Sequence, residues 1–158
     1  MSVLKLPMMS VQEVKELINQ QIMCRIAFQD EEYPYIAPFQ YVVINGVLYF
    51  HFTDYGKKMK LLEKNDRVCV QIEKYEADLS SYQFVSIRGR LNIVYDEFER
   101  KRAIDSLSKL GETQLSTNFL VAHGITPDEG WSSFSAEKPF VIVKLVDVVH
   151  LVGLRSPR

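Results

Sequence analysis

The sequence is poor in the features that mark most metal, secreted and membrane proteins. It holds two cysteines in 158 residues, with no CxxC pair and no cysteine–histidine cluster at zinc spacing. No apolar run reaches the roughly 18 residues that a membrane helix needs, and the first residues, MSVLKLPMM, lack a secretory cleavage pattern. We therefore expect a cytoplasmic protein with no bound metal and no membrane partner.

An excess of either charge is also missing. Nineteen Lys and Arg against 20 Asp and Glu give a net charge of −1, whereas dedicated nucleic-acid binders usually carry a basic excess. The sequence has no Gly-rich dinucleotide fingerprint, no Walker loop, no HExxH zinc helix and no GxSxG elbow. These absences argue against nucleic acid as a partner and against several common enzyme classes.

Short alternating strands dominate what is present. The pair Asn45-Gly46 favours a tight hairpin turn, because both positions tolerate positive φ. The apolar patterns predict strands at 24–29, 35–44, 47–53, 68–73, 82–95 and 139–149, with a continuation of the last strand to Leu154 left open. Helices are predicted at 11–20, where Ser10 and Glu13 fit a capping box, and at 57–64, 96–110 (with Gly111 as its C-cap) and 115–122. We therefore expect a single domain, 1–158, that is mainly β: a small barrel with a few short helices outside it.

The most informative stretch joins two predicted strands. A polar turn, Asp54-Tyr55-Gly56, is followed by Lys57 and Lys58 at the start of a predicted helix. The first turn of a helix has unpaired N–H groups and a partial positive charge, so lysine is disfavoured there unless an anion is present. Lys58 also shares a helical face with leucines, which indicates a packed stem. The pattern favours phosphate binding by Lys58, while for Lys57 phosphate binding and a solvated helix start are equal alternatives.

A second basic group lies on the strand predicted at 82–95. In an extended strand Ser86, Arg88 and Arg90 point to one side. Such a face usually meets solvent, but arginine also suits phosphate because its guanidinium can make paired hydrogen bonds. Gly89 between them allows close approach of another backbone or of a ligand. Combined with the two lysines, this group supports a phosphate site.

Three further features have two interpretations each. The alternation of the strand at 47–53 puts Phe50 and Phe52 on one face, and Tyr49, His51 and Thr53 on the other. His51 is either structural or in contact with a ligand. The aromatic stretch 35–41 suits either a flat wall for a ring system or core packing, and its Pro38 indicates an edge, a bulge or a ligand-facing position. The single tryptophan, Trp131, either covers a pocket or a subunit interface, or anchors its loop. His123 and His150 have no such context, and we leave them structural or unassigned.

Four segments of the chain resemble the FMN-binding split-barrel superfamily typified by pyridoxamine 5′-phosphate oxidase, and most closely its nitroimidazole-reductase-like branch. They cover about residues 8–112 and 138–155, and read CRIAF, YPYIAPFQYVVINGVLYFHFTDYGKKMKLLEKNDRVCVQIE, VSIRGRLNIV and VIVKLVDVVHLVGL. The resemblance implies a six-stranded split barrel that forms a homodimer. It also implies one FMN at each subunit interface, held by contacts from both chains.

The resemblance also assigns roles to individual residues. His51 matches the histidine of the YFH motif near the flavin, which implies a substrate-side or redox-tuning position and makes it a tentative catalytic residue. Thr53 matches the residue before the phosphate turn. The implied phosphate ligands are Lys58, with Lys57, Ser86 and Arg88 as helpers. The strand implied to lie along the flavin ring and ribityl chain carries Pro38, Phe39, Gln40 and Tyr41.

These features favour an FMN-dependent oxidoreductase that acts on a small molecule. The tail VGLRSPR lacks the arginine- and tryptophan-rich motifs with which the oxidase itself binds the pyridoxal phosphate group, and this argues against vitamin B6 oxidase activity. Two alternatives stay open: a non-catalytic binder of haem or a deazaflavin on the same barrel, and an interaction barrel without a ligand. The substrate, the electron donor and the role of residues 113–137 are not predicted.

Overall fold

The computed structural model describes residues 2–158, so the first residue of the predicted domain lies outside the described residues. Antiparallel strands close a barrel in the order β1-β2-β3-β6-β5-β4. They are β1 (Met23–Phe28), β2 (Tyr35–Ile44), β3 (Val47–Phe52), β4 (Arg67–Tyr75), β5 (Tyr82–Ile93) and β6 (Val141–Arg155). The predicted mainly β, six-stranded barrel is confirmed, and the last strand extends one residue beyond Leu154.

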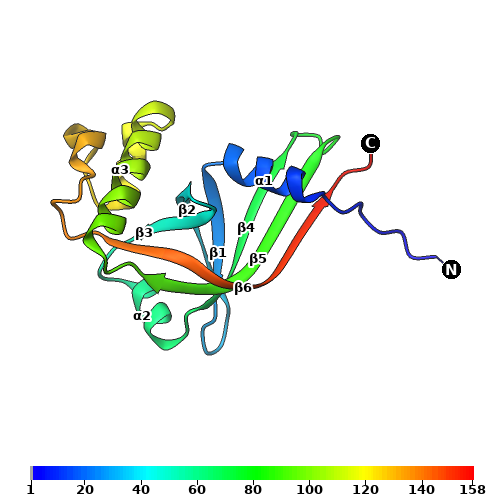
Figure 1. Cartoon of the computed structure of the whole chain (residues 1–158), viewed down its shortest axis with the longest axis horizontal. Coiled ribbons are helices and arrows are strands. Elements are labelled where there is room, and N and C mark those ends of the chain that lie inside the picture. The colour runs from blue at the N-terminus through cyan, green and yellow to red at the C-terminus, as the bar shows by residue number, and fades with distance from the viewer. Residues whose placement is uncertain (1) are drawn as a thin grey trace.

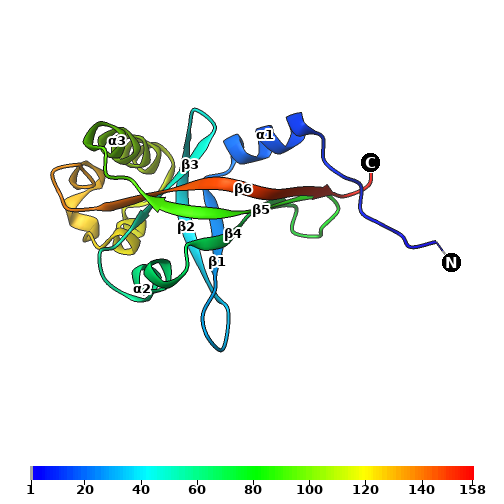
Figure 2. The same ribbon diagram turned by 60° about the horizontal axis from the view of Figure 1, so that its bottom comes forward.

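The helices lie outside the barrel. The α-helices are α1 (Val11–Gln20), α2 (Lys57–Lys64) and α3 (Glu97–Gln114), and the short 3₁₀ helices are η1 (Thr117–His123), η2 (Pro127–Glu129) and η3 (Trp131–Ser133). Figure 1 shows α3 and the segment after it gathered at one end of the long β6, with α1 and both termini toward the other end. The loop between β1 and β2 projects from the barrel (Figure 2). No helix among residues 2–158 is long and apolar enough to cross a membrane.

Local sequence signals account for most element boundaries. At the start of α1, Ser10 and Glu13 form the predicted capping box, each side chain bonded to the other's backbone N–H. The turn between β2 and β3 places Asn45 at φ 51° and Gly46 at φ 77°, as the hairpin prediction requires. The segment predicted as a helix at 115–122 is the 3₁₀ helix η1, and it ends at Gly124 in the left-handed conformation.

The predicted end of α3 is wrong. The helix does not stop at Gly111 but continues to Gln114. Gly111 lies inside the helix, where a Cβ atom would overlap the ring of Trp131. The glycine is therefore required by close packing of η3 against α3, and not by a helix cap. Trp131 is buried in this contact, so it anchors its segment to the helix.

Both faces of β3 are buried, in two different cores. Phe50 and Phe52 point into the barrel, where they pack with aromatic side chains of β1 and β2. Tyr49 and His51 point the other way, under α3 and η1. The predicted alternation of β3 is confirmed, and it places His51 in the layer between the barrel and the outer helices.

Strand β2 changes partners half-way along its length. Residues 35–40 pair with β1, whereas only residues 41–44 pair with β3. Pro38 therefore lies where β2 has no partner on the β3 side, and its missing N–H breaks no bond there. Of the positions predicted for Pro38, an edge is the one that the strand pairing shows. Because β2 and β3 diverge at this point, side chains from both strands can face a shared hollow.

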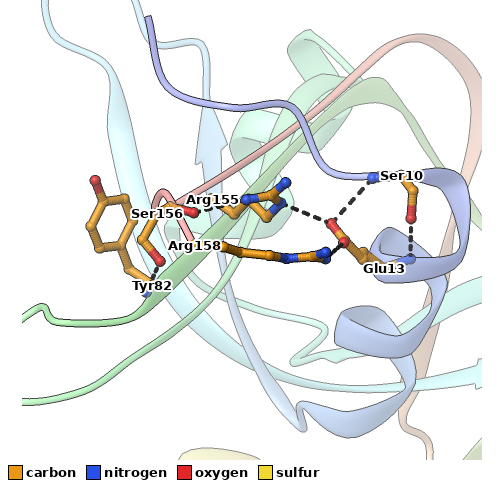
Figure 3. A network of polar contacts seen from close by, with 6 residues as sticks. All are labelled: Ser10, Glu13, Tyr82, Arg155, Ser156 and Arg158. Atoms are coloured by element: carbon orange, nitrogen blue, oxygen red, sulfur yellow. Dashed lines mark hydrogen bonds and ion pairs between the residues drawn. The ribbon is translucent and has the colours of Figure 1, made fainter.

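A polar network ties the two ends of the chain together (Figure 3). The Glu13 carboxylate lies 3.3 Å from Arg155 Nε and 2.5 Å from Arg158. Ser156 accepts a hydrogen bond of 3.2 Å from the Tyr82 backbone N–H. These contacts hold α1 against the end of β6, because the same carboxylate serves both the helix cap and the C-terminal arginines.

Candidate functional site

The two lysines at the start of α2 have different surroundings. Lys57 is paired with Asp30, with Nζ 3.1 Å from Oδ2. The pKa of Asp30 is held below its usual value by the Glu31 backbone N–H and by this lysine. Lys58 Nζ lies 5.0 Å above the centre of the Phe39 ring, and among residues 2–158 it has no carboxylate partner. Lys58 is thus the lysine whose charge remains available for an anion.

The start of α2 itself suits an anion. Its N-cap is Gly56, with φ 96°, and no side chain caps the first turn. The N–H groups of that turn therefore have no side-chain acceptor, and they add to the positive charge of Lys58. Thr53 lies just before this turn, and its hydroxyl donates to the Tyr55 carbonyl at 2.7 Å. That bond fixes the turn that presents the helix start.

Six of the predicted site residues meet at one small cavity. Its volume is about 50 Å³, and side chains of η1, including Phe119 and His123, cover it. A neighbouring cavity of about 140 Å³ is bordered by Lys138 and Phe140 on the other side of His51. Pockets for drug-sized molecules hold about 300–1,000 Å³, so only a phosphate or a ring edge could be enclosed here. The predicted residues at the smaller cavity are Pro38, Phe39, Gln40, His51, Thr53 and Lys58.

Four predicted residues lie outside this cavity, and one of them is Lys57, which is paired with Asp30. Tyr41 points into the barrel core, where its hydroxyl donates to the Ile18 carbonyl at 2.6 Å and burial raises its pKa. Arg88 lies on the outer face of β5 and borders a separate cavity of about 550 Å³. Ser86 faces the same side of β5, between Gln71 and Val152 of the adjacent strands. The contact of these last three with a cofactor stays a prediction, and within one chain they do not join Lys58.

The expectation for Gly89 is confirmed for a neighbouring backbone. A Cβ atom on Gly89 would lie 2.8 Å from the Val146 carbonyl oxygen of β6. The pairing of β5 with β6 shifts register between Arg88 and Arg90 at this point. Arg90 is also engaged, because its guanidinium donates to both carboxylate oxygens of Asp66. Of the two arginines, Arg88 is the one without a carboxylate partner in the described part of the chain.

A buried pair of histidines forms the wall beside Lys58. His51 of β3 and His123 of η1 approach through their Nδ1 atoms at 2.8 Å. The Nε2 atom of His123 lies 2.9 Å from Gln40 Oε1, and the Gln40 amide donates to the Leu107 carbonyl of α3 at 2.9 Å. Burial lowers the pKa of both histidines far below the usual value, and the nearby charge of Lys58 lowers it further. Both rings are therefore neutral at pH 7.

Sequence reasoning left His123 unassigned. It comes at the end of η1, and the only local signal near it is the following Gly124, which ends a helix. Its approach to His51, 72 residues earlier, depends on how η1 packs on α3 and β3. His150, the third histidine, is exposed on β6 and takes no part in the site. No group of three His, Cys, Asp or Glu side chains within residues 2–158 is placed to hold a metal ion.

Aromatic rings enclose the histidine pair. Phe140 lies 4.7 Å from His51, and Phe134 lies 4.7 Å from His123, measured between ring centres. Arg100 of α3 positions the loop that carries Phe140, because its guanidinium donates to the backbone carbonyls of Ala136, Lys138 and Phe140. Residues 113–137, whose role was not predicted, thus cover the His51 side of β3 in the same chain.

Comparisons with known proteins agree with this architecture. A family model described as pyridoxamine 5′-phosphate oxidase matches residues 10–129. No curated protein matches the sequence. An FAD-binding protein from Mesorhizobium loti shares 20% identity over 98% of this chain and 100% of its own, with a TM-score of 0.70. A Bacteroides thetaiotaomicron protein named as a 5-nitroimidazole antibiotic resistance protein shares 22% identity over 98% of this chain and 92% of its own, with a TM-score of 0.64. An FAD and heme binding protein from Mycobacterium smegmatis shares 9% identity over 94% and 72%, with a TM-score of 0.66. At these identities the likeness is one of fold.

Proposed function

This chain belongs to the pyridoxamine 5′-phosphate oxidase family, and we propose that it binds flavin mononucleotide and uses it as an oxidoreductase on a small molecule. The observation that carries the proposal is Lys58, a cation without a carboxylate partner in the described chain, at the uncapped start of α2. Helix starts and lysines both favour phosphate. Similar structures that are named FAD-binding proteins support a flavin, and a single free lysine suits the one phosphate of a mononucleotide.

The residues at the small cavity would contact different parts of the flavin. Lys58 and the first N–H groups of α2 would hold the phosphate, and the divergent part of β2 around Pro38 would face the ring system. His51, neutral and buried, would lie beside the flavin as a substrate-side or redox-tuning residue. The flavin supplies the two-electron chemistry when bound, while the protein fixes its position and surroundings.

We propose further that the protein acts as a homodimer. Ser86 and Arg88 can reach a phosphate at Lys58 only if a second chain presents them, because in one chain Arg88 borders a different cavity. Apolar side chains on the same outer side support an interface, since Ile36 is 61% exposed and Val149 is 81% exposed.

Flavin retention tests the cofactor assignment. The purified protein is mixed with FMN and desalted, and its visible spectrum is recorded. We expect a retained flavin spectrum, and a Kd weakened about 10- to 100-fold in Lys58→Met, since hydrogen bonds to charged groups contribute about 1.5–3 kcal/mol. The exposed Lys60→Met on the same helix is the control and should bind normally. A protein that stays colourless contradicts the proposal.

Turnover separates the enzyme from its alternative, a binder on the same barrel. Bleaching of the bound flavin by a nicotinamide donor, followed by reoxidation with a nitroaromatic acceptor, is expected for an oxidoreductase. Flavin that binds but is not reduced by any donor would favour the non-catalytic binder. A Soret band after addition of haem, lost in His51→Ala, would favour the haem version of that alternative.

Mixing two defective variants tests the shared site. If Arg88 serves the phosphate bound by its partner's Lys58, then Lys58→Met and Arg88→Met should each bind FMN poorly as homodimers. A mixed dimer would contain one site with both residues intact and one site that lacks both. Random subunit exchange between equal amounts makes about half of the dimers mixed, so flavin binding should return to about one site in four. Failure of the mixture to regain FMN contradicts a shared site, because residues acting within one chain cannot complement in this way.

A further inference from the structure

A chain of hydrogen bonds fixes where the protons of the two buried histidines lie. The Leu107 carbonyl can only accept, so the Gln40 group facing it at 2.9 Å is the NH₂. The Gln40 oxygen then faces His123 Nε2 at 2.9 Å and needs a donor, which places the proton of neutral His123 on Nε2. Its Nδ1 is left bare. His51 Nδ1, 2.8 Å from that bare nitrogen, must therefore carry the proton of His51.

These bonds leave the last nitrogen of the chain, His51 Nε2, without a proton. His51 Nε2 keeps its lone pair, and it is buried without a hydrogen-bond partner among the described residues. His51 as a whole is 6% exposed. A buried acceptor without a partner destabilises a protein, so we expect a bound group to satisfy it. The same ring borders both cavities, next to Lys58 on one side and Lys138 on the other.

We propose that Gln40 and His123 are positioning residues, which hold the proton of His51 on Nδ1 so that its Nε2 accepts a hydrogen bond from an N–H or O–H group of the bound flavin. The flavin part rests on the proposed function, whereas the positions of the protons are a property of the free protein. A neutral flavin donor suits a neutral acceptor, because the histidine pair is packed among aromatic rings and lies near Lys58, whose charge opposes an added positive charge.

Nitrogen NMR of the free protein, labelled with ¹⁵N in its imidazole rings, tests the positioning role. At pH 7 we expect opposite tautomers: His51 protonated on Nδ1 and His123 protonated on Nε2. His123→Gln should preserve the His51 tautomer, because the Gln oxygen can accept from Nδ1 while its amide donates to Gln40. His123→Phe fills the aromatic enclosure but offers no acceptor, so His51 should move toward the Nε2–H form that free imidazole prefers.

Addition of FMN to the same sample tests the acceptor role. We expect the His51 Nε2 resonance to shift while Nδ1 stays protonated. His51 protonated on Nε2 in the free protein would overturn the inference whatever the flavin does. Retained FMN with an unmoved Nε2 resonance would overturn the acceptor role. A protein with the expected tautomers that never retains FMN would overturn the proposed function and the flavin half of this inference, and would leave the positioning role established.

Discussion

Mild acid should destabilise this protein through its two buried histidines. Burial lowers the pKa of His51 and His123 in the native state, while in the unfolded chain both return to about 6.5. Between pH 7.5 and 5.5 the native pair stays neutral and the unfolded chain takes up protons. Because the unfolded state binds more protons, the free energy of unfolding rises with pH in this window. The stability that the neutral, buried histidines contribute is therefore fully present above about pH 6.5, and it is lost as the pH falls below that value.

The size of the effect follows from the width of the window. At pH 5.5, one unit below the unfolded pKa, each histidine that stays neutral lowers the free energy of unfolding by about 1.4 kcal/mol, and the pair lowers it by about 3 kcal/mol. Total stabilities are about 5–15 kcal/mol, so the loss is easily measured. Carboxylates do not contribute here. Asp66 and Glu99 have pKa values lowered by Arg90 and Lys144, and they stay ionised in both states above pH 5.5.

Urea unfolding at pH 7.5 and 5.5, followed by Trp131 fluorescence, measures this difference. His123→Gln removes one of the two groups and should halve the acid-induced loss. His150→Gln, at an exposed position on β6, should leave the loss unchanged. A loss below about 1 kcal/mol in the unaltered chain would refute the reasoning, because it means that the native pair takes up protons in this window. An equal loss in His123→Gln would also refute it, because it means that the loss does not come from His123.

Two further substitutions test how the outer layer is built. Gly111→Ala should destabilise the protein by about 1–3 kcal/mol and alter Trp131 fluorescence, because overlap with the buried ring outweighs the gain of about 1 kcal/mol in helix propensity. Glu112→Ala, at the exposed neighbouring position, is the control and should have little effect. A Gly111→Ala protein that is more stable than the unaltered chain would contradict the packing argument. Arg100→Met removes the donors to three backbone carbonyls, so the free energy of unfolding measured in urea should fall by about 1–3 kcal/mol. Hydrogen exchange should also become faster in the loop before β6. Unchanged exchange would show that other contacts hold the loop.

The sequence predicted the barrel well because its boundaries are set by neighbouring residues. The Ser10 capping box and the Asn45-Gly46 turn act over three or four positions, and both form as expected. The alternation of β3 is equally local, and it was enough to place His51 on the face opposite Phe50. For the same reason the strand ends differ from the predictions by only a few residues.

The pair of histidines could not be predicted, because it depends on packing between distant segments. His123 reaches His51 across 72 residues, and Gln40 across 83. The pattern around Gly111 shows the same limit, because a helix cap and a close helix–ring contact both require glycine. Only the position of Trp131 decides between them. Segments whose role comes from such contacts have no periodicity of their own.

The structure distinguishes Lys57 from Lys58, which the helix dipole alone does not. The helix dipole disfavours both lysines in the absence of an anion, so it predicts anion binding equally for each. Lys57 does not need a bound anion, because the Asp30 carboxylate of the projecting β1–β2 loop already supplies a negative charge 3.1 Å away. Lys58 has a ring beneath it instead, 5.0 Å from its Nζ atom. Help from Lys57 in phosphate binding would therefore require it to leave Asp30, whereas Lys58 needs no such exchange.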